Sequence, residues 1–280
     1  MLEVYKFNCF TAPCEVQLYC NDKTKADNCA KDILMEAKRV EAKYNYFDQN
    51  SYLSTLNKRA TNILDTETKT LLTRAKQYYK RTNRTFDITS ATLKDIYNLS
   101  SINEIEKQKE YLSNYTGCEH FEIKKDKLYF DNQYTKIDLG GFVKEYAVDK
   151  VQSIIKRYKI KSALVNFGGD IFALGKKPDK QKFIIAITNP SQKDKTLFTI
   201  AIEDQALTTS ASYERFKIIE DKKFSHIISK DENNNDILSA TVVSNSCVES
   251  GVYSTSLMCD KNIKTNSEKY LINSSLEILR

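Results

Sequence analysis

The sequence places a carboxylate and an amine on either side of a pair of glycines, a combination that suits a phosphate ligand. Asp138 ends a short β-prone run, Gly140 and Gly141 follow, and Lys144 falls in the first turn of a stretch whose apolar residues have helical spacing. Glycines at such a junction let a ligand approach the backbone N–H groups at the helix start, where anions bind. The pattern therefore suggests a corner for a diphosphate and a metal ion. An ordinary strand-to-helix turn with Asp138 as its N-cap explains the same residues.

Two further places in the sequence could carry chemistry. His226 lies in the alternating run FSHII, and histidine is a natural general base near neutral pH. A hydrogen-bonded surface histidine is the alternative. Gly168 and Gly169 separate two apolar runs, which predicts a tight connection between strands. That connection is either only a turn or also a ligand contact.

The elements that must hold these residues follow from the spacing of apolar side chains. Helical periodicity predicts helices at about 27–44, 66–81, 101–114, 143–158 and 248–258. Short β-prone runs predict one or two strands within 3–20, broken at Pro13, and a hairpin within 119–139 that turns at Lys125-Asp126 or Asp131-Asn132. They also predict strands at 163–167, 170–174, 183–188, 197–202, 206–209, 215–219, 224–229 and 240–244. Helices followed by such strands predict an α+β fold with mostly antiparallel sheets and packed helices. We expect residues 1–280 to form one domain, or two closely packed subdomains.

Composition and charge narrow the class of protein. The 280 residues are 41% hydrophobic and 29% charged, which is typical of a globular protein. No apolar run is long enough to span a membrane, so we expect no stable membrane insertion. The first residues lack a signal-peptide pattern and the seven cysteines lack C-x-x-C spacing, which favours a cytoplasmic location. A leader that has been trimmed is the alternative. The net charge of +6 is modest and its signs alternate, which argues against a nucleic-acid partner.

Five blocks in a fixed order carry a resemblance to a known family. They read SYLSTLN, FDIT, IDLGGFVKEYAVD, ALVNFGGDI and ALTTSASYERF, the last followed by FSHI. From about residue 8 to about residue 260 the sequence resembles the FAD:protein FMN transferases, the ApbE family. The resemblance implies an ApbE-like fold and transfer of FMN from FAD to a threonine hydroxyl of an acceptor flavoprotein, with release of AMP. It also implies Mg²⁺, which would neutralise the charge that moves to the leaving AMP with help from a lysine.

The resemblance further implies roles for individual residues. His226 would take the proton of the acceptor hydroxyl, and Asp138 and Lys144 would contact FAD. The carbonyl of Gly141 and the hydroxyl of Thr255 would hold Mg²⁺. The other residues expected at the flavin are Phe10, Phe47, Thr85, Phe86, Asp87 and Ile228.

Four departures from the family's pattern fall at the expected site. Gly251 stands where relatives have an aspartate one helical turn before Thr255, and Glu145 stands where they have a glycine. The segment after His226 reads SKDEN in place of DPRTG, and residues 10–12 read FTA in place of MGT. Because the aspartate is the most negative of the expected ligands, its loss predicts weaker metal binding.

Two other functions remain open on the same scaffold. One is a non-catalytic protein that binds flavin or assists assembly, and the other is an Mg²⁺-dependent FAD pyrophosphatase with water as nucleophile. The metal site distinguishes the two enzymes from the binding scaffold, because the transferase and the hydrolase need a metal ion and a binding scaffold does not.

Overall fold

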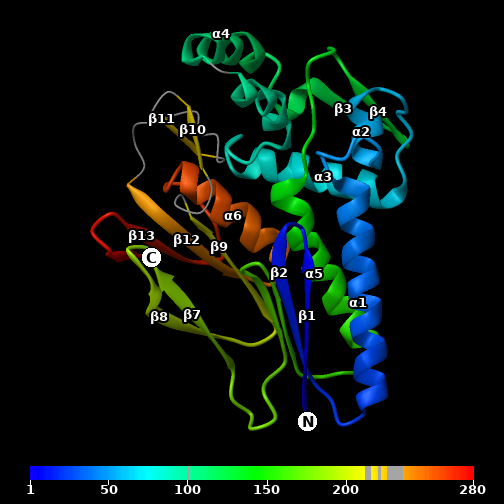
Figure 1. Ribbon diagram of the computed structural model, residues 1–280, viewed down its shortest axis with the longest axis vertical. Helices are drawn as coiled ribbons and strands as arrows, with labels where there is room; N and C mark the ends of the chain where they lie inside the picture. The colour runs from blue at the N-terminus through cyan, green and yellow to red at the C-terminus, as the bar shows by residue number, and fades with distance from the viewer. Residues whose placement is uncertain (100, 212–215, 220–221, 226–235) are drawn as a thin grey trace.

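A large antiparallel sheet with helices on one face forms the frame of the molecule (Figure 1). The computed structural model describes residues 1–99, 101–211, 216–219, 222–225 and 236–280. Its helices are α1 (Lys23–Tyr44), α2 (Tyr52–Asn57), α3 (Thr66–Arg81), η1 (Ile88–Leu93), η2 (Asp95–Asn98), α4 (Ile102–Ser113), η3 (Cys118–His120), α5 (Gly140–Arg157) and α6 (Cys247–Cys259), where η marks 3₁₀ turns. Its strands are β1 (Leu2–Cys9), β2 (Ala12–Tyr19), β3 (Phe121–Lys124), β4 (Lys127–Phe130), β5 (Ala163–Phe167), β6 (Asp170–Leu174), β7 (Phe183–Asn189), β8 (Gln192–Ile202), β9 (Gln205–Ala211), β10 (Phe216–Ile219), β11 (Lys222–Ser225), β12 (Ile237–Ser244), β13 (Glu268–Asn273) and β14 (Ile278–Leu279).

The main sheet has eight strands in the order β1-β2-β5-β6-β9-β12-β13-β14, and each recorded pairing between them is antiparallel. Helices α5 and α6 pack on one face, and the hairpin β7–β8 packs on the other. Strand β6 is buried at all five positions because it is covered on both faces. The predicted α+β fold with mostly antiparallel sheets is confirmed.

The five predicted helices are confirmed as α1, α3, α4, α5 and α6. Helix α1 begins four residues before the predicted start because Asp22 caps it, with Oδ1 accepting from Lys25 N at 3.0 Å. Asp65 caps α3 in the same way, accepting from Thr68 N at 2.8 Å. Both helices bury the apolar stripe that the sequence marks. Among the described residues, no helix has both the length and the apolar character needed to cross a bilayer.

The first hairpin corrects one prediction, since the chain does not break at Pro13. It turns at Phe10 and Thr11, whose φ angles of 53° and 57° fit a two-residue hairpin turn. Pro13 lies inside β2 opposite Asn8. Proline is tolerated near the start of a strand, so it gives no reliable sign of a strand end there.

Most of the remaining strand predictions are also confirmed. The hairpin expected within 119–139 is β3–β4, which turns at Lys125-Asp126. Strands β5 to β10 and β12 match their predicted positions, with ends that differ by a few residues. The predicted strand at 224–229 overlaps β11, and its residues 226–229 lie outside the described part of the chain. That residues 1–280 form one domain, or two closely packed subdomains, stays a prediction.

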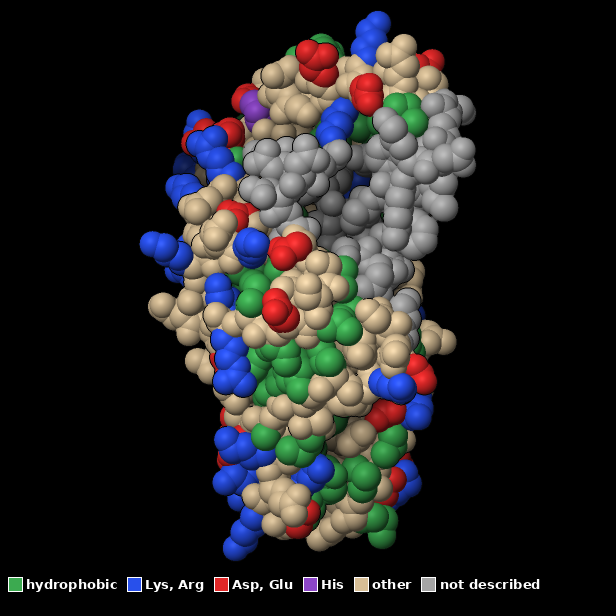
Figure 2. Space-filling model, turned by 90° about the vertical axis from the view of Figure 1, so that its left-hand side faces the viewer, with side chains coloured by type: hydrophobic (Ala, Val, Ile, Leu, Met, Phe, Trp, Pro, Cys, Tyr) green, Lys and Arg blue, Asp and Glu red, His purple; other side chains and the backbone are tan. Residues whose placement is uncertain are grey.

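Figure 2 shows the molecule from the side that lies to the left in Figure 1. Among the described side chains of this face, Lys and Arg are interspersed with Asp and Glu, and hydrophobic side chains gather near the middle. Opposite charges that alternate in this way produce only a weak long-range field.

Candidate functional site

The start of α5 is an open corner of the molecule. Asp138 is fixed just before it, with its N–H donating to Ile88 O at 2.9 Å and its Oδ1 accepting from Gly140 N at 2.8 Å. Gly140 and Gly141 are exposed, and a Cβ added to Gly141 would meet no described atom within 4 Å. Gly141 has φ −89° and ψ 21°, which kinks the helix in its first turn. The backbone at Gly140 and Gly141 is therefore exposed, although the N–H groups of Gly140, Phe142 and Val143 already donate within the junction. Contact of this helix start with a ligand stays a prediction.

Lys144 joins this corner to the glycine turn between β5 and β6. Its Nζ lies 2.7 Å from Oδ2 of Asp170 and 3.3 and 3.4 Å from the carbonyl oxygens of Phe167 and Gly168. Burial alone would lower the pKa of Lys144, but the carboxylate of Asp170, which is 2% exposed, outweighs it and raises that pKa. Lys144 therefore stays a cation beside the glycine turn.

The turn itself requires glycine. Gly168 and Gly169 have φ angles of 59° and 94°, which disfavour other residues. A Cβ added to Gly168 would lie 2.6 Å from Cβ of Ala12 in the first hairpin. Close packing of the two turns thus explains the first glycine, and the alternative of a ligand contact for the pair stays a prediction.

Helices α5 and α6 meet through two carboxyl groups, those of the half-buried Asp149 and the buried Glu145. Asp149 accepts from the N–H groups of Cys247 at 2.7 Å and Val248 at 3.2 Å, which anchors the start of α6, and burial raises its pKa to about 6. Glu145, one turn earlier in α5, is 6% exposed and faces Gly251, where an added Cβ would lie 2.6 Å from Cγ of Glu145. Burial and the nearby charge of Asp170 outweigh the opposing charge of Lys144 and raise the pKa of Glu145 to about 8.

Thr255 lies one helical turn beyond Gly251 and is half-buried. Its hydroxyl is 3.2 Å from the hydroxyl of Ser210 on β9, which in turn lies 2.9 Å from the hydroxyl of Ser254. These contacts fix Thr255 where α6 packs against the sheet. Its expected role in holding Mg²⁺ stays a prediction.

A second group of predicted residues lies around Asp138. The ammonium group of Lys94 pairs with Asp138 and lies 5.1 and 5.3 Å from the ring centroids of Tyr46 and Phe47. Phe47 is 77% exposed, so its ring is accessible to a ligand. No pattern in the sequence marks Lys94, which the turns η1 and η2 bring to this place.

The FDIT block has a visible structural role. Phe86 is 6% exposed and packs against Phe142 of α5, with ring centroids 5.8 Å apart. Asp87 caps η1, because its Oδ1 accepts from both N and Oγ1 of Thr89, at 2.9 and 2.6 Å. Thr85, which is half-buried, donates its N–H to the carbonyl of Thr82. Direct contact of this block with flavin stays a prediction.

The last predicted residues differ in how far the structure describes them. Phe10 sits in the first hairpin turn, half-buried, with its ring centroid 6.5 Å from that of Phe167. It therefore lies near the carbonyl that Lys144 contacts. His226 and Ile228 lie outside the described residues.

The oxygen groups at the α5–α6 corner fit Mg²⁺ better than a transition metal. The described residues contain no cluster of three or more His, Cys, Asp or Glu side chains suited to a metal ion. Mg²⁺ does not need one, because it keeps several waters and takes one or two carboxylates. Oε2 of Glu145 is buried without a hydrogen-bond partner among the described residues, and the absence of a side chain at Gly251 makes room for the side chain of Glu145. Such an oxygen suits a hard cation.

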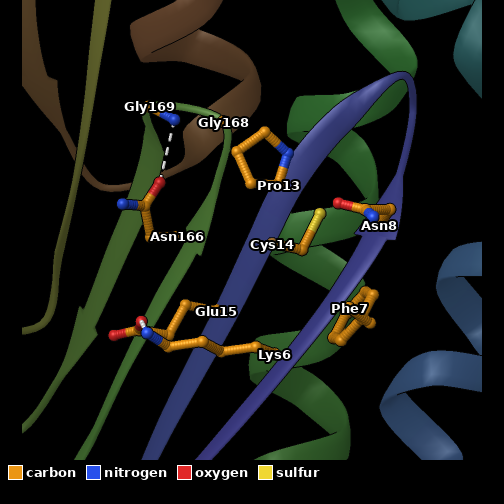
Figure 3. Close-up of a pocket in the computed structure, with 9 residues that line it drawn as sticks. All are labelled: Lys6, Phe7, Asn8, Pro13, Cys14, Glu15, Asn166, Gly168 and Gly169. Carbon is orange, nitrogen blue, oxygen red and sulfur yellow. Dashed lines mark hydrogen bonds and ion pairs between the residues drawn. The ribbon is translucent and has the colours of Figure 1, made fainter.

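A surface hollow of about 530 Å³ lies beside the same glycine turn (Figure 3). Its lining comes from β1, β2 and the β5–β6 turn and consists of Lys6, Phe7, Asn8, Pro13, Cys14, Glu15, Asn166, Gly168 and Gly169. Asn166 accepts from Gly169 N at 2.8 Å, which braces the turn. None of the described residues expected at the flavin lines this hollow, so we do not assign flavin to it.

The fold and the start of α5 together define a class of protein. Its members have an antiparallel sheet backed by helices, and a strand–glycine–helix junction beside a second glycine turn. The model of the ApbE family matches residues 10–272, and the chain belongs to that family. The resemblance seen in the sequence is confirmed.

Relatives and solved structures agree with this assignment. The chain is 29% identical over 192 residues to the FAD:protein FMN transferase of Buchnera aphidicola subsp. Baizongia pistaciae, covering 64% of this chain and 56% of that protein. It is 32% identical over 148 residues to the FAD:protein FMN transferase of Vibrio cholerae, covering 51% and 44%. The matches thus span about half the length of these curated relatives. The crystal structure of the ApbE protein from Thermotoga maritima has a TM-score of 0.88 at 19% identity, covering 100% of this chain and 97% of that one. For the flavin transferase ApbE from Vibrio cholerae the TM-score is 0.81 at 19% identity, covering 100% and 96%.

Proposed function

We propose that this protein is an FAD:protein FMN transferase that depends on Mg²⁺ and modifies a threonine of an acceptor flavoprotein. Membership in the ApbE family and the names of the relatives support the activity. The observation that carries the proposal is the ion pair of Lys144 with Asp170, which holds a cation between the open start of α5 and the β5–β6 turn. A half-buried lysine beside an exposed helix start is suited to a diphosphate.

In the proposed reaction the threonine oxygen forms a bond to the phosphorus of the FMN moiety, and the bond from that phosphorus to the bridging oxygen breaks. AMP leaves with the bridging oxygen, and the hydroxyl proton passes to a base, for which His226 is the candidate. Lys144 and the first turn of α5 bind the diphosphate and oppose its growing negative charge. Asp138 contacts FAD beside them.

Mg²⁺ would be held by the carbonyl of Gly141 and the hydroxyl of Thr255. The ion supplies charge neutralisation at the phosphate oxygens. Phe10, Phe47, Thr85, Phe86, Asp87 and Ile228 are the proposed flavin contacts. Phe47 is the most exposed of those described and can present a ring face. A cytoplasmic location stays a prediction.

The proposal is tested by measuring whether AMP release requires the acceptor. The protein is incubated with FAD and Mg²⁺, with and without a flavoprotein fragment that bears the threonine, and AMP and FMN are separated by chromatography. We expect AMP without free FMN, and only when the fragment is present. Equal amounts of AMP and FMN without the fragment would identify a pyrophosphatase. Bound FAD with no AMP would identify a binding scaffold.

A further inference from the structure

Glu145 and Gly251 share one space between α5 and α6. An added Cβ on Gly251 would lie 2.6 Å from Cγ, 3.0 Å from Cδ and 2.9 Å from Oε1 of Glu145. The carboxyl group of Glu145 therefore fills the position where any side chain at 251 would begin. A side chain at either position excludes one at the other unless the neighbour moves.

The two helices run antiparallel at this contact. Asp149 of α5 meets Cys247 at the start of α6, and Glu145, one turn earlier in α5, meets Gly251, one turn later in α6. Figure 1 shows α5 and α6 side by side on the sheet. Successive turns of one helix thus meet successive turns of the other.

This order leads directly to the proposed metal ligands. One more turn along each helix reaches Gly141 on α5 and Thr255 on α6, which supply the carbonyl and the hydroxyl. Glu145 is therefore one turn from Gly141 on its own helix and opposite the residue one turn before Thr255. Among the described residues its buried Oε2 has no hydrogen-bond partner. A buried oxygen of this kind costs free energy unless a ligand or ion satisfies it.

We propose that Glu145 supplies, from α5, the carboxylate ligand for Mg²⁺ that Gly251 on α6 cannot supply. The inference rests on the proposed function for the presence of Mg²⁺, and it assigns a ligand that the sequence pattern alone would place on the other helix. The two departures at 145 and 251 are then one exchange. Compared with the family's pattern, the carboxylate is on α5 instead of α6, and the glycine that leaves room for it is on α6 instead of α5. The weaker metal binding expected from the loss at 251 does not follow.

The exchange predicts how substitutions combine. Gly251→Asp alone places a second carboxyl group against Glu145, where the atoms overlap. Glu145→Gly alone removes the carboxylate and leaves a gap. The double variant Glu145→Gly/Gly251→Asp has one carboxylate and one glycine again, on opposite helices.

The test measures Mn²⁺ binding to the whole chain by electron paramagnetic resonance of the free ion, without FAD or acceptor. Glu145→Gln keeps the shape of the side chain and should weaken Mn²⁺ binding by about tenfold or more. Glu145→Gly/Gly251→Asp should bind Mn²⁺ within about threefold of the natural protein, while Glu145→Gly should not. Glu249→Gln is the matched control, because Glu249 is the other acid near this end of α6, and it should leave binding unchanged. Thermal unfolding shows that each variant is folded.

Each outcome decides the inference. Weak binding by Glu145→Gln together with recovery in the double variant supports it. Unchanged Mn²⁺ binding by a folded Glu145→Gln, or loss in Glu249→Gln instead, overturns it. Absence of Mn²⁺ binding by the natural protein also overturns it. Flavin transfer by the natural protein is measured separately, so failure of the ligand assignment is distinguishable from failure of the proposed function.

Discussion

At the scale of single residues, the site depends on charges that are held out of water. Lys144 and Asp170 form an ion pair that is largely removed from solvent, next to a turn with two glycines at positive φ. Breaking such a pair from one side leaves a buried charge without its partner, which costs far more than losing a surface pair. This difference gives the first prediction.

Asp170→Asn should lower the free energy of unfolding by about 3 kcal/mol, because Lys144 would lose its buried counter-ion. Asp95→Asn is the matched control, since the pair of Asp95 with Lys136 is exposed, and the expected loss is below about 1 kcal/mol. Urea unfolding at pH 7 measures both. Similar losses in the two variants would show that burial does not strengthen the Lys144 pair.

The proposed base gives the second prediction. His226→Ala should lower the rate of flavin transfer by about a hundredfold or more while FAD affinity changes little, because a proton-transfer group acts mainly in the transition state. His120→Ala is the control: His120 pairs with Asp131 at 3.1 Å and has no expected catalytic role. Single-turnover rates and FAD titration separate the two effects. Normal transfer by His226→Ala would assign the base elsewhere.

At the scale of elements, regular apolar spacing made the helices and most strands predictable, and capping residues account for where α1 and α3 begin. The 3₁₀ turns η1 and η2 were not predicted, because their residues follow no helical period. These turns hold Lys94 against Asp138, so the ion pair between the two residues could not be predicted either. Strand β13 was missed as well, since its run EKYLIN is short and does not alternate.

The carboxylate of Glu67 connects three helices through hydrogen bonds. Glu67 at the start of α3 accepts from Arg39 and Lys43 of α1, at 2.6 and 2.7 Å, and from the hydroxyl of Tyr146 on α5 at 2.8 Å. Burial alone would raise the pKa of Glu67, but these bonds outweigh it and hold that pKa well below its ordinary value. Three helices, α1, α3 and α5, are thus joined at Glu67.

Glu67→Gln should therefore reduce the free energy of unfolding at pH 7 by about 2 kcal/mol. Because the folded pKa is depressed, the stabilisation is fully present above the ordinary value of 4.5 and is lost as the pH falls below it towards the folded pKa. The difference between the natural protein and the variant should shrink over that range. Denaturant unfolding between pH 7 and pH 3 measures it, with Glu106→Gln on the exposed side of α4 as control. A difference that stays constant with pH would rule out the ionised network as its source.

At the scale of the whole molecule, the site is assembled from distant parts of the chain. The first hairpin, the start of α5, the β5–β6 turn and the length of α6 come together because β2, β5, β6 and β9 are neighbours in one sheet and both helices pack on the same face. Sequence spacing marked Gly140-Gly141 and Gly168-Gly169 but could not show that Lys144 bridges them. It also marked Glu145 and Gly251 as separate departures. Only the packing of α5 against α6 reveals that they occupy one space.

The central claim is that this molecule attaches FMN covalently to another protein, and intact-mass spectrometry of the acceptor fragment tests it most directly. With FAD and Mg²⁺, we expect the fragment to gain the mass of one FMN less one water, and substitution of its threonine by alanine to abolish the gain. Lys144→Met should reduce the gain about a hundredfold or more, because the diphosphate would lose its cation. An unmodified fragment after prolonged incubation with folded, FAD-bound protein would contradict the claim.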